Sequence, residues 1–227
     1  MNLPPCSRIA WRPSYRIVAS RFPPTGIFDA IADPADLDAI HELEGMTNPR
    51  LRQELGEIRL VPASRRITGP GTTPIMAAFT HPNPEGSRFS DGTWGVYYAA
   101  RDRDTAIAET VHHRQVFLAR THEPPTTLEM RCYLARISGA FHDVRGGWPR
   151  IHDADSYAAS QALARRLRSS GSDGVVYDSV RRTDGQCVAV LHPDRIAPVT
   201  QGPHLLYYWD GRRITHVVVA SETLVLP

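Results

Sequence analysis

Short stretches of alternating apolar and polar residues recur along the chain and predict β-strands. The first is Tyr15–Ala19, which ends shortly before Pro23-Pro24. A second strand is predicted at residues 95–100, with Val96 and Tyr98 on one face and Tyr97 on the other. A longer alternating run predicts a third strand at residues 129–137. These segments are separated by turn residues and helical patterns, so they predict a mixed fold.

Two further pairs of apolar runs flank Asp-Gly dipeptides, which favour tight reversals of the chain. Residues 174–179 and 186–191 lie on either side of Asp184-Gly185. Residues 205–209 and 214–220 lie on either side of Asp210-Gly211. Each pair predicts a β-hairpin.

Helical spacing of apolar residues predicts several helices between these strands. One begins at Asp33-Pro34 and ends near Gly45, and another follows Asn48-Pro49. Asp102 and Asp104 are alternative N-caps for a helix that contains Glu109. The clearest helical pattern covers residues 155–170 and ends at Gly171. The apolar run at residues 74–79 fits either a strand or a short helix.

This inventory has prominent hairpins and no regular alternation of strand and helix. It therefore favours an α+β fold, with compact mixed or antiparallel sheets and flanking helices, over a doubly wound parallel fold. A chain of 227 residues is long enough for one domain with a substantial core.

Composition limits the classes of partner. The net charge is +2, and all 26 basic residues counted as Lys+Arg are arginine, so no electrostatic signal points to nucleic acid or to an anionic membrane. The three cysteines form no CxxC pair, which fits a reducing compartment. No apolar run approaches the roughly 20 residues of a membrane span, and no secretory signal is apparent. We expect a cytoplasmic protein.

Four residues form the candidate site. Arg88 follows Gly86-Ser87 and suits a phosphate; Tyr98 can stack on a flat heterocycle; Glu109 can stabilise a developing sugar cation. Ser179 ends a predicted strand beside a hairpin. Each has an ordinary structural alternative, namely a surface arginine, a core tyrosine, a solvated helix glutamate and a turn serine.

Other chemistries lack their motifs. The chain has no Gly-x-Ser-x-Gly elbow, no His-Glu-x-x-His, no Walker A loop and no Gly-x-Gly-x-x-Gly loop. His142-Asp143 and His152-Asp153 are better explained as surface loops than as a metal site. We expect no metal.

The ordered motifs resemble a known family. Glu85-Gly-Ser-Arg88, Val96-Tyr-Tyr-Ala-Ala100, Thr105-Ala-Ile-Ala-Glu109 and Ser172-Asp-Gly-Val-Val-Tyr-Asp-Ser179 are similar to the core of RES-domain proteins. That family is named for an arginine, a glutamate and a serine, and its members are usually toxins of bacterial toxin–antitoxin pairs. The resemblance implies a fold like that of diphtheria-toxin-like ADP-ribosyltransferases. It also implies a single domain over residues 1–227, with a helical insertion at about 33–60 and a C-terminal hairpin at about 204–220.

The resemblance further implies an enzyme that uses NAD as substrate and breaks its nicotinamide–ribose bond. Arg16 and Arg88 are expected to clamp the pyrophosphate, Tyr98 to stack on nicotinamide or its ribose, and Glu109 to stabilise the cation. Ser179 is expected to orient Glu109 or to contact NAD.

The sequence does not identify the acceptor of the ADP-ribosyl group. Phosphorolysis or hydrolysis would degrade NAD, whereas the alternative is mono-ADP-ribosylation of a target protein. A non-catalytic binding module and a nuclease are weaker alternatives. The implied partner is an antitoxin with an Xre-like helix-turn-helix region that covers the active site.

Overall fold

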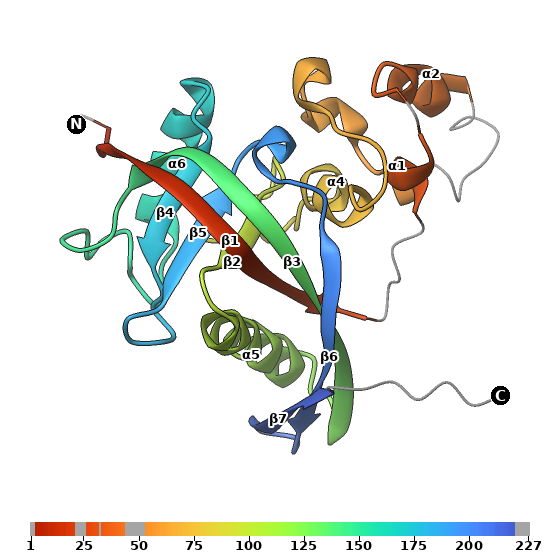
Figure 1. Cartoon of the computed structure of the whole chain (residues 1–227). Helices are drawn as coiled ribbons and strands as arrows, with labels where there is room; N and C mark the ends of the chain where they lie inside the picture. The colour runs from red at the N-terminus through yellow and green to blue at the C-terminus, as the bar shows by residue number, and fades with distance from the viewer. Residues whose placement is uncertain (1–2, 21–25, 32, 44–52, 221–227) are drawn as a thin grey trace, which may run out of the picture.

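The computed structural model describes residues 3–20, 26–31, 33–43 and 53–220, and it shows a mixed α+β architecture (Figure 1). Its strands form a seven-stranded sheet in the order β1-β2-β5-β4-β3-β6-β7. The strands are β1 (Cys6–Ala19), β2 (Tyr97–Ala100), β3 (Thr126–Asp143), β4 (Gly174–Asp178), β5 (Gln186–Val190), β6 (Thr200–Trp209) and β7 (Ile214–Ala220). The expected α+β class is confirmed.

The helices lie between these strands in the sequence. They are α1 (Ile27–Ala30), α2 (Asp36–Leu43), α4 (Thr73–Thr80), α5 (Arg103–Arg120) and α6 (Ala158–Ser169), with 3-10 turns η1 (Ile58–Leu60), η2 (Ala63–Arg65) and η3 (Pro193–Arg195). No helix among the described residues is both long enough and apolar enough to cross a membrane.

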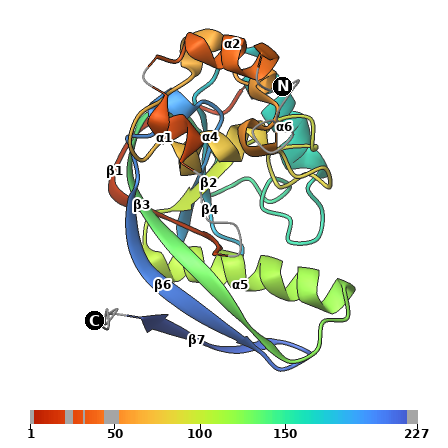
Figure 2. The ribbon, with the colours of Figure 1, turned by 90° about the vertical axis from the view of Figure 1, so that its right-hand side faces the viewer.

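Strand β3 connects the parts of the sheet. It pairs with β1 along most of its length, with β6 through its first half and with β4 at His142 and Asp143. Figure 2 shows β3 and β6 side by side, with α5 packed beside them. The pairing of Tyr15 with Ala100 joins β1 to β2. Strands β1, β3, β4, β5 and β2 thereby form a closed circuit of pairings, which fixes the strands that carry the candidate site.

Alternation along the strands divides the core between two faces of the sheet. On β2, Tyr97 belongs to one buried cluster, together with residues of α4 such as Met76. Tyr98 packs against the other cluster, to which Ala106 of α5 and Leu163 of α6 contribute. The predicted division of Tyr97 and Tyr98 between opposite faces is therefore confirmed, and α5 and α6 cover the Tyr98 face.

Most predicted strands are present and several are longer than predicted. The first strand extends back to Cys6, and the segment predicted at 129–137 extends to Thr126–Asp143. Both expected hairpins form, by antiparallel pairing of β4 with β5 and of β6 with β7. The last hairpin buries Tyr207 and Trp209 in the core.

The helices show where local signals were sufficient. Asp102, not Asp104, caps α5, because its carboxylate accepts hydrogen bonds from the N–H and the hydroxyl of Thr105 at 2.9 and 2.7 Å. The ambiguous segment 74–79 lies in helix α4. Helix α6 begins at Ala158 rather than at 155, because Asp153 binds the N–H groups of Asp155 and Ser156 in a preceding turn.

Two helix predictions fall partly outside the described residues. Helix α2 confirms the helix after Asp33-Pro34, but its predicted end near Gly45 is outside. The start of the next helix at Asn48-Pro49 is outside as well. The division into one domain with an insertion at about 33–60 stays a prediction.

Candidate functional site

A tight loop before β2 presents Arg88. The loop is closed by hydrogen bonds between the backbones of Ser87 and Ser90, and Gly86 enters it at a φ of 76°. A Cβ at Gly86 would lie 2.7 Å from the Ser90 carbonyl oxygen, so glycine is required there. The sequence Gly-Ser-Arg therefore allows a sharp turn that directs the arginine inward.

Arg88 is buried and held from two sides. Its Nη1 donates to the carbonyl oxygens of Ile151 and Asp153 at 2.8 and 2.9 Å. Its guanidinium lies over the ring of Tyr157, 4.7 Å from the ring centroid. Among the described residues, its Nε and Nη2 have no hydrogen-bond partner, so part of the guanidinium remains able to bind an anion.

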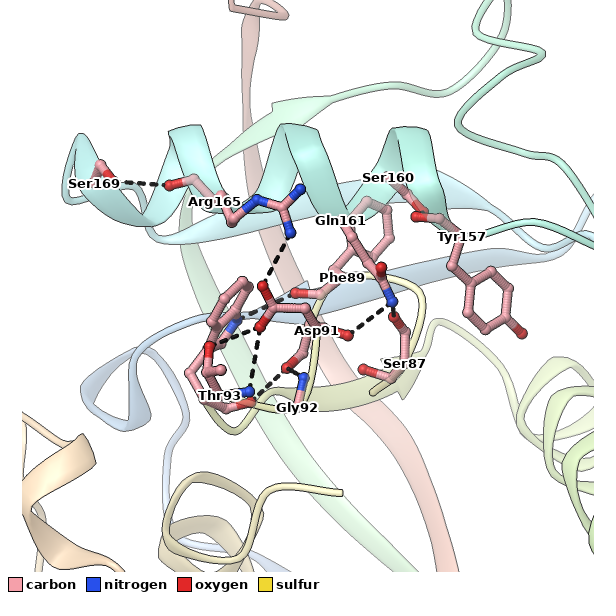
Figure 3. Close-up of polar contacts among 12 residues, drawn as sticks. Ser87, Phe89, Asp91, Gly92, Thr93, Tyr157, Ser160, Gln161, Arg165 and Ser169 are labelled. Carbon is pink, nitrogen blue, oxygen red and sulfur yellow. Dashed lines mark hydrogen bonds and ion pairs between the residues drawn. The ribbon is translucent and has the colours of Figure 1, made fainter. Parts of the chain in front are cut away.

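Helix α6 fixes the same loop (Figure 3). The Gln161 side-chain amide donates to the carbonyl oxygens of Ser87 and Ser90 at 3.0 and 3.1 Å. Arg165 pairs with Asp91 at 2.9 Å. Tyr157, the N-cap residue of this helix, stacks on Arg88, so the helix and its cap both shape the loop and contact its arginine.

Tyr98 reinforces the loop through its hydroxyl. The phenol oxygen accepts a hydrogen bond from the Phe89 N–H at 2.8 Å and shares another with Ser87 Oγ at 2.8 Å. Burial raises the pKa of Tyr98 to about 12, so the hydroxyl is protonated at neutral pH. Tyr98 thus bonds to both neighbours of Arg88, a positioning contact that the sequence pattern did not predict.

Glu109 and Ser179 meet directly. Ser179 Oγ donates to Glu109 Oε1 at 2.6 Å, joining the β4–β5 turn to helix α5. The same oxygen accepts the backbone N–H groups of Arg181 and Arg182, each at 3.1 Å. The turn is therefore organised around Ser179, and the expectation that Ser179 orients Glu109 in the reaction stays a prediction.

The charges of Arg88 and Glu109 act on the same buried pair beneath the site. Tyr177 of β4 and Cys187 of β5 have pKa values well above their usual ranges, chiefly because both are buried. For each, Glu109 raises the pKa further and Arg88 lowers it. The Arg88 guanidinium and the Glu109 carboxylate thus both lie near enough to Tyr177 and Cys187 to act on them electrostatically.

His112 and Arg181 extend this region. Burial and then the charge of Arg181 lower the pKa of His112, and Glu109 and Arg88 also act on that histidine. Arg181 is held by a hydrogen bond from its Nη2 to the Ala154 carbonyl oxygen at 2.8 Å. A second arginine therefore lies near Arg88 and Glu109, and nothing in the local sequence of Arg181 distinguished it from the many other arginines.

Arg16 does not join the other four residues, so its expected pairing with Arg88 in one clamp is not seen. Arg16 alternates with Ile17 on β1 and lies over the ring of Tyr97, 4.6 Å from the centroid, on the opposite face of the sheet. Toward the side of the site, Arg16 donates a hydrogen bond to the backbone oxygen of Tyr98 at 3.1 Å. The register of β1 against β3 determines this face.

Metal-binding residues do not gather in the described parts of the chain, where no group of three or more His, Cys, Asp or Glu could hold a metal ion. Asp143, one of the residues considered for such a site, is bound by Arg145 and Ser7. The Asp143 carboxylate therefore has a structural role.

Sequence comparison finds a family profile and a related protein that match this chain. The profile of the RES domain matches residues 63–210. A protein from Sinorhizobium fredii strain NBRC 101917 / NGR234, "Uncharacterized protein y4oC", is 36% identical over 208 residues, covering 88% of this chain and 84% of its own length.

Comparison with solved structures finds a match in the crystal structure of the M. tuberculosis MbcT–MbcA toxin–antitoxin complex. The match has a TM-score of 0.47 and 11% identity, and covers 91% of this chain and 87% of that one. The family assignment follows from the RES domain profile, whose matched range contains Arg88, Tyr98, Glu109 and Ser179. The chain belongs to the RES domain family.

Proposed function

We propose that this protein is the toxin of a type II toxin–antitoxin pair and that it cleaves the nicotinamide–ribose bond of NAD. The observation that carries the proposal is the Glu109 carboxylate, bound by Ser179 Oγ at 2.6 Å in a region also faced by Arg88. NAD has a cationic nicotinamide as leaving group and an anionic pyrophosphate. The Glu109 carboxylate suits the positive charge of the reacting ribose, and the Arg88 guanidinium suits the pyrophosphate. Membership of the RES family supports the same assignment.

The chemistry needs little from the protein. The nicotinamide of NAD is positively charged, so the departing ring takes the bonding electrons and leaves neutral, without a proton donor. Positive charge develops on the ribose, as in glycoside cleavage. Glu109 stabilises that charge, and a group preorganised in this way typically contributes about 3–4 kcal/mol to lowering the barrier.

The other residues bind and position NAD. Arg88 has Nε and Nη2 left for a phosphate oxygen, and Tyr98 holds the loop that carries it. The stacking of Tyr98 on nicotinamide stays part of the proposal. Arg16 is left out of the clamp, because it lies over Tyr97 on the other face.

We favour inorganic phosphate as acceptor, because Arg181 lies beside His112 near Glu109 and can hold a second anion. A phosphate oxygen then bonds to the ribose carbon as the bond to nicotinamide breaks, which gives ADP-ribose 1″-phosphate and nicotinamide. Transfer to a protein side chain is the alternative. The proposed partner is an antitoxin with an Xre-like helix-turn-helix region that covers the site, and the proposed location is the cytoplasm.

The test is NAD consumption by purified protein with and without phosphate, followed by mass spectrometry of small molecules and of added lysate proteins. Phosphate-dependent appearance of ADP-ribose 1″-phosphate supports phosphorolysis, whereas a protein that gains the ADP-ribose mass supports transfer. Glu109→Gln is the matched control, and we expect at least about a 100-fold loss of turnover with the fold retained. Undiminished turnover in that variant would remove Glu109 from the mechanism.

A further inference from the structure

A second feature of the molecule lies apart from the Arg88–Glu109 region. It is a cavity of about 210 Å³ lined by residues of η1, η3 and the end of α6, together with Trp94 and Phe79. Its walls are mostly apolar, and its polar side chains are Arg168 and His192. By comparison, an engineered apolar cavity of about 150 Å³ binds benzene. The space therefore suits a small ring or a short hydrocarbon.

His192 lines this cavity and carries an unsatisfied polar atom. The residue is 9% exposed, and its Nε2 is buried with no hydrogen-bond partner among the described residues. Buried nitrogen atoms of this kind are rare, because each costs about 1–3 kcal/mol when left unpaired. Burial, and then the charge of Arg65, lower the pKa of His192, so the ring is neutral at pH 7. A neutral imidazole can offer Nε2–H to an acceptor.

Three arginines lie near His192, and two of them form ion pairs with aspartates among the described residues. Arg65 pairs with Asp194 at 2.7 Å, and Arg195 pairs with Asp173 at 2.8 Å. Arg168 also acts on His192, but among the described residues it has no carboxylate partner. Its guanidinium lies 5.5 Å from the ring centroid of Trp94, at the same cavity. The cavity is thus apolar with a cation and a hydrogen-bond donor.

We propose that this cavity binds a small monocarboxylate, whose ring or hydrocarbon body packs between Trp94 and Phe79 and whose carboxylate accepts from Arg168 and His192. An apolar body explains the walls, and an anionic group pairs the arginine that lacks an acid.

Binding there would contact the support of the Arg88 loop. The indole N–H of Trp94 donates to the Phe89 carbonyl oxygen at 3.2 Å, and Ser90 Oγ donates to the Trp94 carbonyl oxygen at 2.6 Å. Trp94 therefore links the cavity to Phe89 and Ser90, the two residues that follow Arg88 in the loop. Arg88, Tyr98, Glu109 and Ser179 do not line this cavity, so the proposed monocarboxylate occupies a different place from the one proposed for NAD.

The experiment is calorimetric titration of the full chain with benzoate and, separately, with the neutral isostere benzamide. We expect saturable benzoate binding with a dissociation constant at or below about 1 mM, and at least tenfold weaker binding of benzamide. Arg168→Gln and His192→Leu should each weaken benzoate binding about tenfold. Leu60→Phe should abolish it by filling the cavity, which Leu60 lines.

Arg166→Gln is the control on the same helix, because Arg166 does not line the cavity. It should leave benzoate binding unchanged. No saturable binding, equal affinity for benzamide, or full binding in Leu60→Phe would each overturn the proposal. Arg168 is exposed on α6, so its variant keeps the test decisive if the His192 variant fails to fold. The readout is binding alone and does not depend on NAD cleavage.

Discussion

Ser179 Oγ donates to Glu109 Oε1 at 2.6 Å, and this one contact ties the β4–β5 turn to helix α5. A hydrogen bond to a charged group contributes about 1.5–3 kcal/mol. We therefore expect Ser179→Ala to lower kcat for NAD cleavage about 10- to 100-fold, with a smaller change in KM. Steady-state kinetics measure both. Ser179→Thr keeps a hydroxyl and should restore most of kcat; a threonine variant as slow as the alanine variant would contradict this positioning role.

The Tyr98 hydroxyl supports the Arg88 loop, so Tyr98→Phe should affect more than stacking. The change removes the partner of the Phe89 N–H, and we expect a loss of about 1–3 kcal/mol in the free energy of unfolding. KM for NAD should rise several-fold as the loop loosens. Denaturant unfolding and kinetics measure the two effects.

Tyr97→Phe is the matched control for that variant. Tyr97 is fully buried on the same strand, but its hydroxyl has no hydrogen-bond partner in the part of the chain that the structure describes. Removing it should leave stability unchanged or slightly higher. If the two phenylalanine variants were equally stable, the Tyr98 hydroxyl would not hold the loop.

The N-cap of α5 can be tested with neighbouring aspartates. Asp102→Ala removes the acceptor of the Thr105 N–H and should cost about 1 kcal/mol of stability. Asp104, in the first turn of the same helix, is exposed and should be replaceable by alanine at a smaller cost. Chemical denaturation of both variants decides between them, and the reverse order would assign the cap to Asp104.

Acid stability should depend on Asp143. Hydrogen bonds from Arg145 lower the pKa of Asp143 to about 2. Because the unfolded value is about 3.9, the folded protein keeps this carboxylate ionised at lower pH. The resulting stabilisation is complete above pH ~4 and is lost as pH falls towards 2. It amounts to about 1–2 kcal/mol.

Asp143→Asn should therefore unfold more easily than the parent at neutral pH, and the difference should shrink below pH ~4. Unfolding free energies measured across that range check the sign. A difference that grows on acidification would show that another carboxylate is responsible.

Local signals predicted much of the fold. Asp184-Gly185 specified the β4–β5 hairpin, and Asp102 was one of two predicted caps, because both signals act within a few residues. The apolar segment at 74–79 could not be assigned, since every one of its positions suits either a strand or a buried helix; packing against the Tyr97 side of the sheet made it a helix.

The site depends more on distant contacts. The resemblance to RES-domain proteins singled out both Glu109 and Ser179, and the structure places them in contact. Arg16 lies apart from Arg88 because the face that Arg16 occupies is fixed by the pairing of β1 with β3, here with Tyr133, which no local pattern reveals. Gln161 was missed as a loop anchor, because its two acceptors are backbone oxygens far away in sequence.

The long pairing of β1 with β3 has a consequence for synthesis on the ribosome. Ser14 bonds to the Ala135 carbonyl oxygen across 121 residues, so β1 waits for more than half of the chain before it has its main partner. Ser179 is translated later still, and Glu109 lacks its hydroxyl until then. Non-local pairing of this kind also folds slowly. A nascent chain therefore emerges without an assembled site, and under the proposed function only a nearly finished polypeptide would be able to cleave NAD.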